Sequence, residues 1–209
     1  MADSLSVVIL AGGSSKRMRA DKAFLKINGR TFIRTIYEEA SKISEDILVV
    51  IGSKPTKRFR RVLGSDATII KDTFNLDNPM GGMLSALEKV KNDYVAFIAC
   101  DLPLVKSELI KKLFSLAYGH SAAVPRWSNG TVEPLCAVYQ TSQARQAGMK
   151  ALDANLIGCQ NLISFLADVL FVDTQMLRGV DPDLRSFMNI NSAEDLEKLI
   201  AISGAMIKR

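Results

Sequence analysis

The sequence predicts an α/β protein in which a mostly parallel sheet is covered by helices on both faces. Three observations lead to this fold class. Short apolar runs alternate along the chain with longer amphipathic stretches. The runs are continuous, with no polar residue at every second position, which is typical of strands buried on both faces. An alternation of strands and helices implies right-handed crossovers, and such crossovers join parallel strands.

The first half of the chain carries the clearest elements. The apolar runs that we expect to be strands are Ser6–Leu10, Ile47–Ile51, Ala67–Ile70 and Tyr94–Ile98. Between and after these runs, apolar residues recur at helical spacing. The helices expected on this basis are Phe32–Ile43, Met83–Val90 and Leu109–Ala117.

The second half is less regular. Val132–Tyr139 reads as a strand that Pro134 interrupts, which places it at an edge or a bend of the sheet. A last helix is expected from about Ser192, where Asn191 and Glu194 resemble a capping box. The other expected elements are strands at Ser121–Pro125, Val169–Val172 and Phe187–Ile190 and helices at Thr141–Leu152 and Asn161–Ala167. No linker or repeat interrupts the pattern, so we expect residues 1–209 to form a single domain.

Composition narrows the class of protein. Of the 209 residues, 48% are hydrophobic and 23% are charged, which excludes a disordered or fibrous chain. No apolar run reaches the ~18 residues of a membrane span. Residues Met1–Ser6 have no basic region ahead of an apolar stretch, so we expect no secretory signal. The net charge of +5 suits a phosphate-rich ligand but is too small to imply nucleic acid by itself.

Cysteine and histidine offer little chemistry. Cys100, Cys136 and Cys159 are an odd number, widely spaced and without a C-x-x-C pair, which argues against a disulfide framework or a zinc site. We expect reduced cysteines in a cytoplasmic protein. His120 is the only histidine and no nucleophile motif surrounds it, so we expect a structural role.

Polar residues follow three of the expected strands. Ligands of open parallel sheets bind beyond the carboxyl ends of the strands. The first strand is followed by Gly12 and Gly13 and then by Arg17 and Lys22, while Asp72 and Asp101 follow the third and fourth strands. A glycine pair, basic residues and two carboxylates are therefore expected to converge on one edge of the sheet.

The glycine pair has two interpretations. Gly12 and Gly13 let the backbone approach a ligand closely, and their N–H groups can point at phosphate or at base edges. Arg17 and Lys22 supply positive charge nearby. The segment is neither a Walker A loop nor a dinucleotide fingerprint, because both glycine patterns are absent. The alternative is an ordinary strand-to-helix turn with solvated cations.

The two carboxylates differ in how strongly they suggest a site. Asp101 ends a buried apolar strand, where an unpaired carboxylate is costly and needs a partner. Mg²⁺ binds one or two carboxylates together with phosphate oxygens, so Asp101 is a candidate metal ligand. Asp72 could bond a ribose or a base, or it could simply stabilise a turn.

Three further segments have both a functional and a structural interpretation. Gly81 and Gly82 stand at the start of an expected helix, where they leave room for a ligand or form a turn. Trp127 could stack on a flat ring or anchor a loop. The densest basic run is expected to be the solvated face of a short helix, and it consists of Lys54, Lys57, Arg58, Arg60 and Arg61.

Taken together, these motifs resemble those of the molybdenum cofactor guanylyltransferases. The resemblance extends from about Val7 to Leu199 in the family's order. The matching segments are L-A-G-G-x-S-x-R-M at 10–18 with D-K-A at 21–23, P-M-G-G-M at 79–83, C-D-L-P at 100–103, E-P-L at 133–135 and F-x-N-x-N-x-x-E-D-L at 187–196.

The resemblance implies a three-layer, Rossmann-like nucleotidyltransferase domain that acts in the cytoplasm. Members of this family transfer GMP from GTP to the terminal phosphate of molybdopterin, or of its molybdenum form, and release pyrophosphate. Arg17, Lys22 and Asp101 would be catalytic, with Mg²⁺ on Asp101. Asn189 and Asn191 would lie on the acceptor side. The residues expected to hold the nucleotide are Leu10, Ala11, Gly12, Gly13, Lys22, Asp72, Gly81 and Asp101.

Two alternatives remain open at this stage. A transferase of the same fold could use CTP or another phosphorylated acceptor, and a regulator could bind GTP without turnover. The expected partners are GTP and molybdopterin, with no nucleic acid or membrane and with a weak homo-oligomer as an option. A nucleic-acid binder built on the basic run is disfavoured by the modest charge and the 7% aromatic content.

Overall fold

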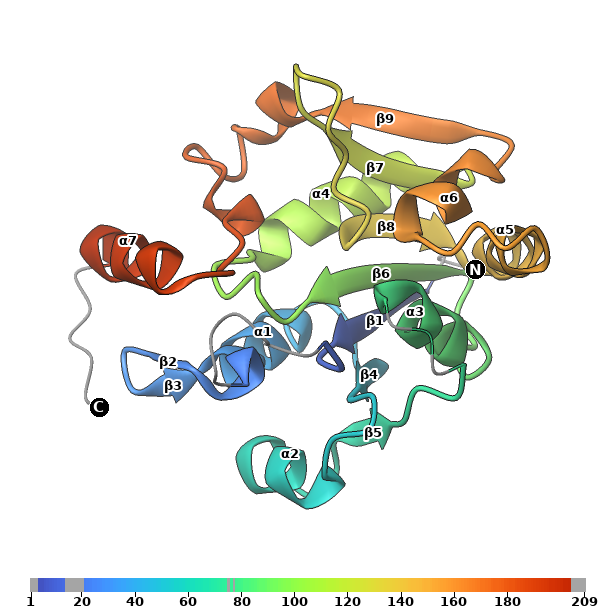
Figure 1. Cartoon of the computed structure of the whole chain (residues 1–209). Coiled ribbons are helices and arrows are strands. Elements are labelled where there is room, and N and C mark those ends of the chain that lie inside the picture. Colours follow the sequence, from blue (N-terminus) through green and yellow to red (C-terminus); the bar gives the residue numbers. More distant parts are fainter. Residues whose placement is uncertain (1–3, 14–20, 75, 77, 204–209) are drawn as a thin grey trace.

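The computed structural model describes residues 4–13, 21–74, 76 and 78–203, and it has the predicted fold class (Figure 1). Its main sheet has seven strands in the order β5-β4-β1-β6-β8-β7-β9. The strands are β1 (Leu5–Leu10), β4 (Ile47–Val50), β5 (Thr68–Ile70), β6 (Tyr94–Ala99), β7 (Ala122–Arg126), β8 (Cys136–Gln140) and β9 (Val169–Asp173). A separate hairpin consists of β2 (Lys26–Ile27) and β3 (Arg30–Thr31).

The sheet is mostly parallel, as predicted. β1 runs parallel to both β4 and β6, β4 to β5, and β7 to β9, whereas β8 is antiparallel to β6 and β7. The register pairs Leu10 of β1 with Val50 on one side and Ala99 on the other. The three central strands therefore end at the same level, and the residues that follow them meet at one edge.

Helices cover both faces of the sheet (Figure 1). The α-helices are α1 (Phe32–Ala40), α2 (Thr56–Leu63), α3 (Pro79–Leu87), α4 (Ser107–Ala117), α5 (Thr141–Asp153), α6 (Cys159–Ser164) and α7 (Ala193–Ser203). Short 3₁₀ helices are η1 (Lys22–Phe24), η2 (Thr174–Leu177) and η3 (Arg185–Phe187). Apolar residues of α1, α2 and α4 pack on one face, and those of α3, α5 and α6 on the other. In the part of the chain that is described, no helix has the length and apolar character needed to cross a membrane.

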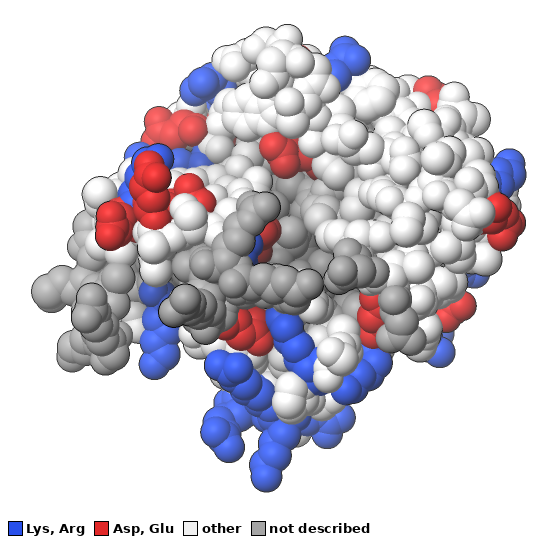
Figure 2. Space-filling view, viewed as in Figure 1, with Lys and Arg blue, Asp and Glu red and all other residues white. Residues whose placement is uncertain are grey.

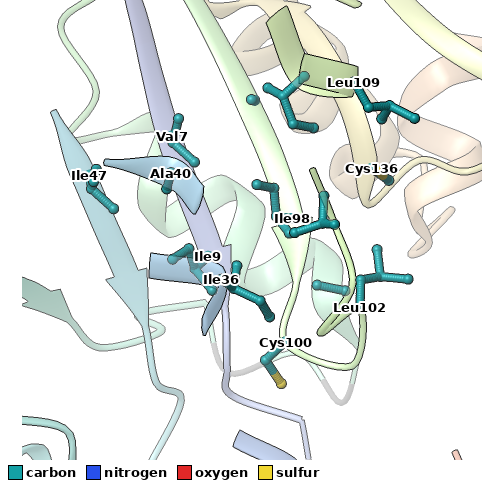
Figure 3. Packing of buried hydrophobic residues seen from close by; sticks show 14 of the residues in the cluster. Val7, Ile9, Ile36, Ala40, Ile47, Ile98, Cys100, Leu102, Leu109 and Cys136 are labelled. Atoms are coloured by element: carbon teal, nitrogen blue, oxygen red, sulfur yellow. The ribbon is translucent and has the colours of Figure 1, made fainter. Parts of the chain in front are cut away.

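The central strand shows why its apolar run is continuous. Val7 and Ile9 point to the face covered by α1, where Ile36 lies close by (Figure 3). Val8 belongs to the cluster on the opposite face, which contains Met83 of α3. Full burial of each such side chain contributes about 1.5–3 kcal/mol. A strand that loses solvent on both faces has no place for a polar residue until it ends.

The strand predicted over 132–139 is shorter than expected and lies inside the sheet. Only Cys136–Gln140 forms β8, and this strand lies between β6 and β7, so the prediction of an edge strand was wrong. Pro134 lacks a backbone N–H and precedes the strand, which is why it does not disturb the ladder. Val132 makes an isolated bridge with Arg126.

Helices α3 and α6 begin earlier than predicted. The helix expected from Met83 begins at Pro79, because the side chain of Asn78 accepts a hydrogen bond from the Met80 N–H at 2.8 Å and caps it. α6 occupies Cys159–Ser164, where Asn161–Ala167 was expected. Both differences arise at helix termini, which periodicity locates poorly.

The C-terminal segment also departs from the prediction. Phe187–Ile190 was expected to be a strand, but Arg185–Phe187 forms η3. The last helix is capped by Ser192 and Asp195, one residue later than the predicted pair, with the Asp195 N–H donating to Ser192 Oγ and the Ser192 N–H to Asp195 Oδ2.

The C-terminal helix packs beside the hairpin near the N-terminus. Leu199 of α7 forms a small cluster with Ile27, Phe32 and Ile190. The Ile190 N–H donates to the Asp101 carbonyl oxygen at 2.9 Å. Packing and hydrogen bonding together bring residues 189–191 to the edge where β1 and β6 end.

Candidate active site

A cavity of about 590 Å³ opens where the central strands end and α3 begins. This is the edge of the sheet at which the sequence predicted a ligand, and Figure 2 shows this face of the molecule hollowed near its middle. The lining residues are Leu10, Gly12, Gly13, Lys22, Val50, Gly52, Ser53, Asp72, Leu76, Asn78, Pro79, Gly82, Ala99, Cys100, Asp101, Leu102, Glu133, Pro134, Leu135 and Asn189.

Lys22 and Asp101 meet in this cavity. Lys22 Nζ lies 3.3 Å from Asp101 Oδ2 and donates to Asn191 Oδ1 at 2.5 Å. Both members of the ion pair are largely covered, with 15% and 23% of their side chains exposed. Three residues that are far apart in the sequence therefore form one cluster.

The position of Lys22 follows from local contacts of its neighbours. The Asp21 side chain accepts from the Ala23 N–H at 3.3 Å and caps η1. Phe24 packs edge-on against Phe59 of α2, with ring centroids 4.8 Å apart. With the residues on both sides of Lys22 fixed, its side chain is directed into the cavity.

Lys54 joins the two ends of the segment between Ala11 and Asp21. Its Nζ donates to the Ala11 carbonyl oxygen and to Asp21 Oδ1, both at 2.7 Å. The side chain is only 17% exposed, and Arg58 adds a second, longer contact to Asp21 at 3.8 Å. Lys54 thus ties β1 to the residue directly before Lys22.

The carboxylate of Asp101 has the character of a cation ligand. Its Oδ1 is buried and accepts no hydrogen bond from any residue that the structure describes. A buried carboxylate oxygen left without a donor is costly, and a bound cation removes that cost. No group of three or more His, Cys, Asp or Glu side chains comes together within the described ranges. A Mg²⁺ ion on Asp101 would therefore draw its other ligands from phosphate and water.

The glycine pair meets another glycine across the edge of the sheet. A Cβ on Gly12 would lie 3.0 Å from the backbone nitrogen of Gly52, which itself has φ +58°. Only glycines allow the two backbones to approach this closely. Gly13, in contrast, has no atom near the position of a Cβ and is exposed.

Asp72 is held against the first turn of α3. Its Oδ1 accepts from the Phe74 N–H at 2.9 Å and from Ser85 Oγ at 3.0 Å. A Cβ on Gly81 would lie 2.7 Å from Asp72 Oδ2. The turn interpretation and the position at the cavity both hold for Asp72, and Gly81 is the residue that leaves room for its carboxylate.

Glu133 brings a third carboxylate to the cavity, beside those of Asp72 and Asp101. Its Oε1 accepts from the indole Nε1 of Trp127 at 2.8 Å. The Trp127 ring packs edge-on against Phe187, with centroids 5.7 Å apart, so it anchors a loop as one interpretation predicted. Burial raises the pKa of the Glu133 carboxyl, the indole hydrogen bond opposes this, and the charge of Asp101 raises the pKa further.

The structure places the other predicted residues as follows. Asn189 lines the cavity. Asn191 does not line it but accepts a hydrogen bond from Lys22, which does. Ala11 is fully buried and contributes its carbonyl oxygen to Lys54. Arg17 lies outside the described residues. The contacts that sequence reasoning missed are those of Lys54 and Glu133. The E-P-L segment at 133–135 indicated that Glu133 could belong to the site. Nothing in the basic run distinguished Lys54 from the solvated cations beside it.

The rest of the basic run forms an exposed positive surface. Figure 2 shows Lys and Arg side chains gathered at the end of the molecule where Figure 1 places α2. Lys57, Arg60 and Arg61 are exposed, as the prediction of a solvated helix face requires. Lys54 precedes the helix and is the exception, because its charge is turned inward.

The cysteines and the histidine lie outside the polar cluster. Burial raises the pKa of the Cys100 thiol to about 12 and that of Cys159 to about 11, and it raises the pKa of Cys136 further. All three are free thiols. His120 Nδ1 lies 2.8 Å from Asp168 Oδ2 at the partly exposed start of β9.

Comparison with known proteins shows which sequences this chain is similar to. The sequence profile described as "MobA-like NTP transferase domain" matches residues 7–169. The chain is 30% identical over 204 residues to a protein of Methanosarcina acetivorans named "Probable molybdenum cofactor guanylyltransferase", covering 94% of this chain and 90% of that protein. It is 32% identical to the "Molybdenum cofactor guanylyltransferase" of Desulfosudis oleivorans, covering 94% of both chains.

Solved structures give the same result for the fold. The "Molybdopterin-guanine dinucleotide biosynthesis protein A" of Archaeoglobus fulgidus superposes with a TM-score of 0.80 at 25% identity, covering 95% of this chain and 98% of that one. The 2-C-methyl-D-erythritol 4-phosphate cytidylyltransferase of Thermus thermophilus superposes with a TM-score of 0.70 at 19% identity, covering 96% and 99%, which is a likeness of fold alone. The predicted Rossmann-like nucleotidyltransferase fold is confirmed.

Proposed function

Because this chain belongs to the MobA-like NTP transferase family, we propose that it is a molybdenum cofactor guanylyltransferase. The reaction transfers GMP from GTP to the terminal phosphate of molybdopterin, or of its molybdenum form, and releases pyrophosphate. A phosphate oxygen of the acceptor forms a bond to the α-phosphorus of GTP. The bond from that phosphorus to the oxygen bridging to the β-phosphate breaks, and both electrons leave with pyrophosphate.

The observation that carries this proposal is the cluster of Lys22, Asp101 and Asn191 at the cavity. It supplies what the reaction requires. The nucleophile is a phosphate monoester that is mostly dianionic near pH 7, because its second pKa is about 6, so no general base is needed. What is needed is in-line positioning and relief of the repulsion between two anions.

Each residue has a distinct part in this scheme. Lys22 donates to phosphate oxygens and neutralises their charge. The backbone of Leu10, Gly12 and Gly13 lets the nucleotide approach the end of β1 closely. Asp72 and Gly81 would hold the nucleoside at the start of α3, whose positive end faces an anion bound in the cavity. Arg17 would add a further positive charge.

The residues present fit a divalent cation. The unpaired Oδ1 of Asp101 would hold Mg²⁺, and the remaining ligands would be phosphate and water oxygens. Bound Mg²⁺ would neutralise charge on the triphosphate and on the leaving pyrophosphate. Lys22 holds the other oxygen, Asp101 Oδ2, at 3.3 Å and so limits the rotation of the carboxylate.

We infer that the partners are GTP and molybdopterin, without nucleic acid or membrane, and that the protein acts in the cytoplasm. Residues 1–209 would act as one domain, because α7 near the C-terminus packs against the hairpin near the N-terminus. Asn189 and Asn191 would lie on the acceptor side, and a weak homo-oligomer is compatible with this scheme.

The test is pyrophosphate release from the purified protein with GTP, MgCl₂ and molybdopterin, and with the acceptor omitted as control. CTP, ATP and UTP are assayed in parallel, together with thermal shifts for each nucleotide. A nucleotide at ~100 times its Kd stabilises the fold by about 2.7 kcal/mol, which shifts the melting temperature by several degrees. Faster release with CTP would reassign the nucleotide, and GTP binding without release under any condition would favour a regulator.

A further inference from the structure

Glu133 is a carboxylate in the cavity to which the proposed reaction gives no role. One oxygen, Oε1, is fixed by the Trp127 indole at 2.8 Å, and no described residue donates to the other. The backbone is fixed as well, because the Glu133 N–H donates to the Pro125 carbonyl oxygen at 3.0 Å. The side chain is half-buried and lines the cavity. It therefore presents one oriented oxygen to a ligand.

The order of the strands places Glu133 on one side of Asp101. Asp72 follows β5, Gly52 follows β4, Gly12 follows β1 and Asp101 follows β6. Glu133 precedes β8, which is the next strand beyond β6. Neighbouring strands lie about 4.8 Å apart, so Asp72 and Glu133 stand at opposite ends of a row of strand termini. A nucleoside held near Asp72 leaves the Glu133 end to the acceptor.

A negative charge at this end needs a reason. Both substrates are anions, and a carboxylate that faces the cavity repels their phosphates. Such a group is retained at a ligand site when the ligand offers it hydrogen-bond donors. The acceptor carries these donors on its ring, because a pterin has an N–H and an NH₂ group side by side on its 2-amino-4-oxopyrimidine edge.

We propose that Glu133, oriented by Trp127, binds the N–H and NH₂ groups on the 2-amino-4-oxopyrimidine edge of the acceptor's pterin. This inference rests on the proposed function, since it names the part of the acceptor that the site reads. A site built to accept from an amino group rejects a ring that lacks it, because the carboxylate then loses its donors. Glu133 is in this sense a specificity-determining residue.

Guanine carries the same edge, so the source of the ring must be tested. If Glu133 bound the guanine of GTP, its loss would abolish the preference for GTP over inosine triphosphate, which lacks the amino group. If Glu133 were instead a ligand of Mg²⁺ beside Asp101, its loss would raise the Mg²⁺ concentration needed for GTP binding. The preference for GTP over inosine triphosphate thus reports on guanine binding, and the Mg²⁺ requirement reports on metal binding. Either change would count against binding of the pterin.

The chain contains a built-in reporter for the experiment. Trp127 is its only tryptophan and donates to Glu133. Pterin absorbs in the range where tryptophan emits, so pterin bound at Glu133 should quench the emission. The titration uses pterin and lumazine, which carries an oxygen in place of the 2-amino group, with the full protein saturated with GTP and Mg²⁺. We expect pterin to bind more tightly than lumazine.

The main variant is Glu133→Gln, with Glu88→Gln at the far end of α3 as the matched control. Glutamine has nearly the same shape but presents an NH₂ group to the ring. We expect the Kd for pterin to rise about tenfold or more, in line with the loss of hydrogen bonds to a charged group. The Kd for lumazine, which keeps the ring N–H but has no amino group, should rise by a smaller factor. The control should bind both rings like the wild type.

A second variant tests the geometry without touching the carboxylate. Trp127→Phe keeps the ring packing on Phe187 but removes the indole donor. Equilibrium dialysis should show weaker pterin binding than in the wild type, by a smaller factor than for Glu133→Gln. Circular dichroism of both variants checks the fold.

Four results would overturn the inference. These are unchanged pterin affinity in both variants, equal loss of pterin and lumazine, loss of the preference for GTP over inosine triphosphate, and a raised Mg²⁺ requirement. Failure of the proposed function is a separate result. It would show as no pyrophosphate release by the wild type with GTP and molybdopterin, and Glu133-dependent pterin binding would still stand in that case.

Discussion

Replacement of Asp101 by asparagine exchanges one carboxylate oxygen for an amide and leaves the shape of the side chain almost unchanged. The buried Oδ1 then has no full negative charge to offer a cation, and Lys22 loses its ionic partner but keeps Asn191. The substitution therefore affects the proposed chemistry and the fold to different degrees, and each effect has its own magnitude.

The effect on the fold is small. Lys22 and Asp101 lie 3.3 Å apart and are 15% and 23% exposed. Ion pairs that keep contact with solvent contribute about 0.2–1 kcal/mol, so the melting temperature should fall by at most about 4 °C. The effect on turnover is large, because removal of one preorganised electrostatic group costs about 10²–10³-fold. Asp101→Ala should lower turnover by at least ~10²-fold as well.

The assay is pyrophosphate release at saturating GTP and molybdopterin while MgCl₂ is varied. Asp153→Asn, at the exposed end of α5, is the matched control and should behave like the wild type. Thermal unfolding of the three proteins separates lost chemistry from lost structure. Near-normal turnover of Asp101→Asn at the same Mg²⁺ requirement would remove Asp101 from the mechanism and refute the reasoning.

Four further predictions follow from single contacts. Lys22→Ala should raise the Kd for GTP about 10–100-fold in calorimetric titrations, because it removes a charged donor, and unchanged affinity would contradict its role. Lys54→Met removes two hydrogen bonds of the Lys54 ammonium group. It should destabilise the fold by about 1–3 kcal/mol in denaturant unfolding and also weaken GTP binding. An unchanged denaturant concentration at the midpoint of unfolding would argue against this. At Gly52 the backbone has a φ of +58°, and an added Cβ would lie 3.1 Å from the backbone of Gly12, so Gly52→Ala should lower the melting temperature. Gly29→Ala should lower it less, because Gly29 has a φ of +78° but open space around the Cβ position. Equal shifts would show that the contact with Gly12 is unimportant. Cys100, with its pKa raised to about 12, should stay protonated at pH 8 and react with an aromatic disulfide only after unfolding, so rapid labelling of the native protein at this residue would be the contrary result.

The sequence was most informative where one physical cause dominates. Apolar runs such as Ser6–Leu10 are continuous because both faces of the strand are covered, and the observed β1 differs from the prediction by one residue. The position of Asp101 was predictable for the same reason, since the first charged residue after a buried strand must lie at the edge of the sheet. Local sequence therefore predicted the edge of the sheet at which the cavity lies.

The sequence-based predictions were wrong where contacts between distant parts of the chain determine the local structure. Phe187–Ile190 has the apolar character of a strand, but its burial comes from packing on Trp127 and on the hairpin, which sequence periodicity cannot show. Lys54 looked like one more solvated cation because its two acceptors are 43 and 33 residues away. Glu133 carried a recognisable motif, but only the structure joins it to the indole.

The hydrogen bond between Lys22 and Asn191 spans 169 positions of the chain. Contacts of such long sequence separation form late, because the entropy of closing a long loop must be overcome before they contribute any stability. On the ribosome, β1, β4 and β6 of the nascent chain would thus assemble well before Asn191 becomes available to Lys22. We therefore expect Lys22 to gain this acceptor only once residue 191 has left the ribosome, later than the strands that position the cavity.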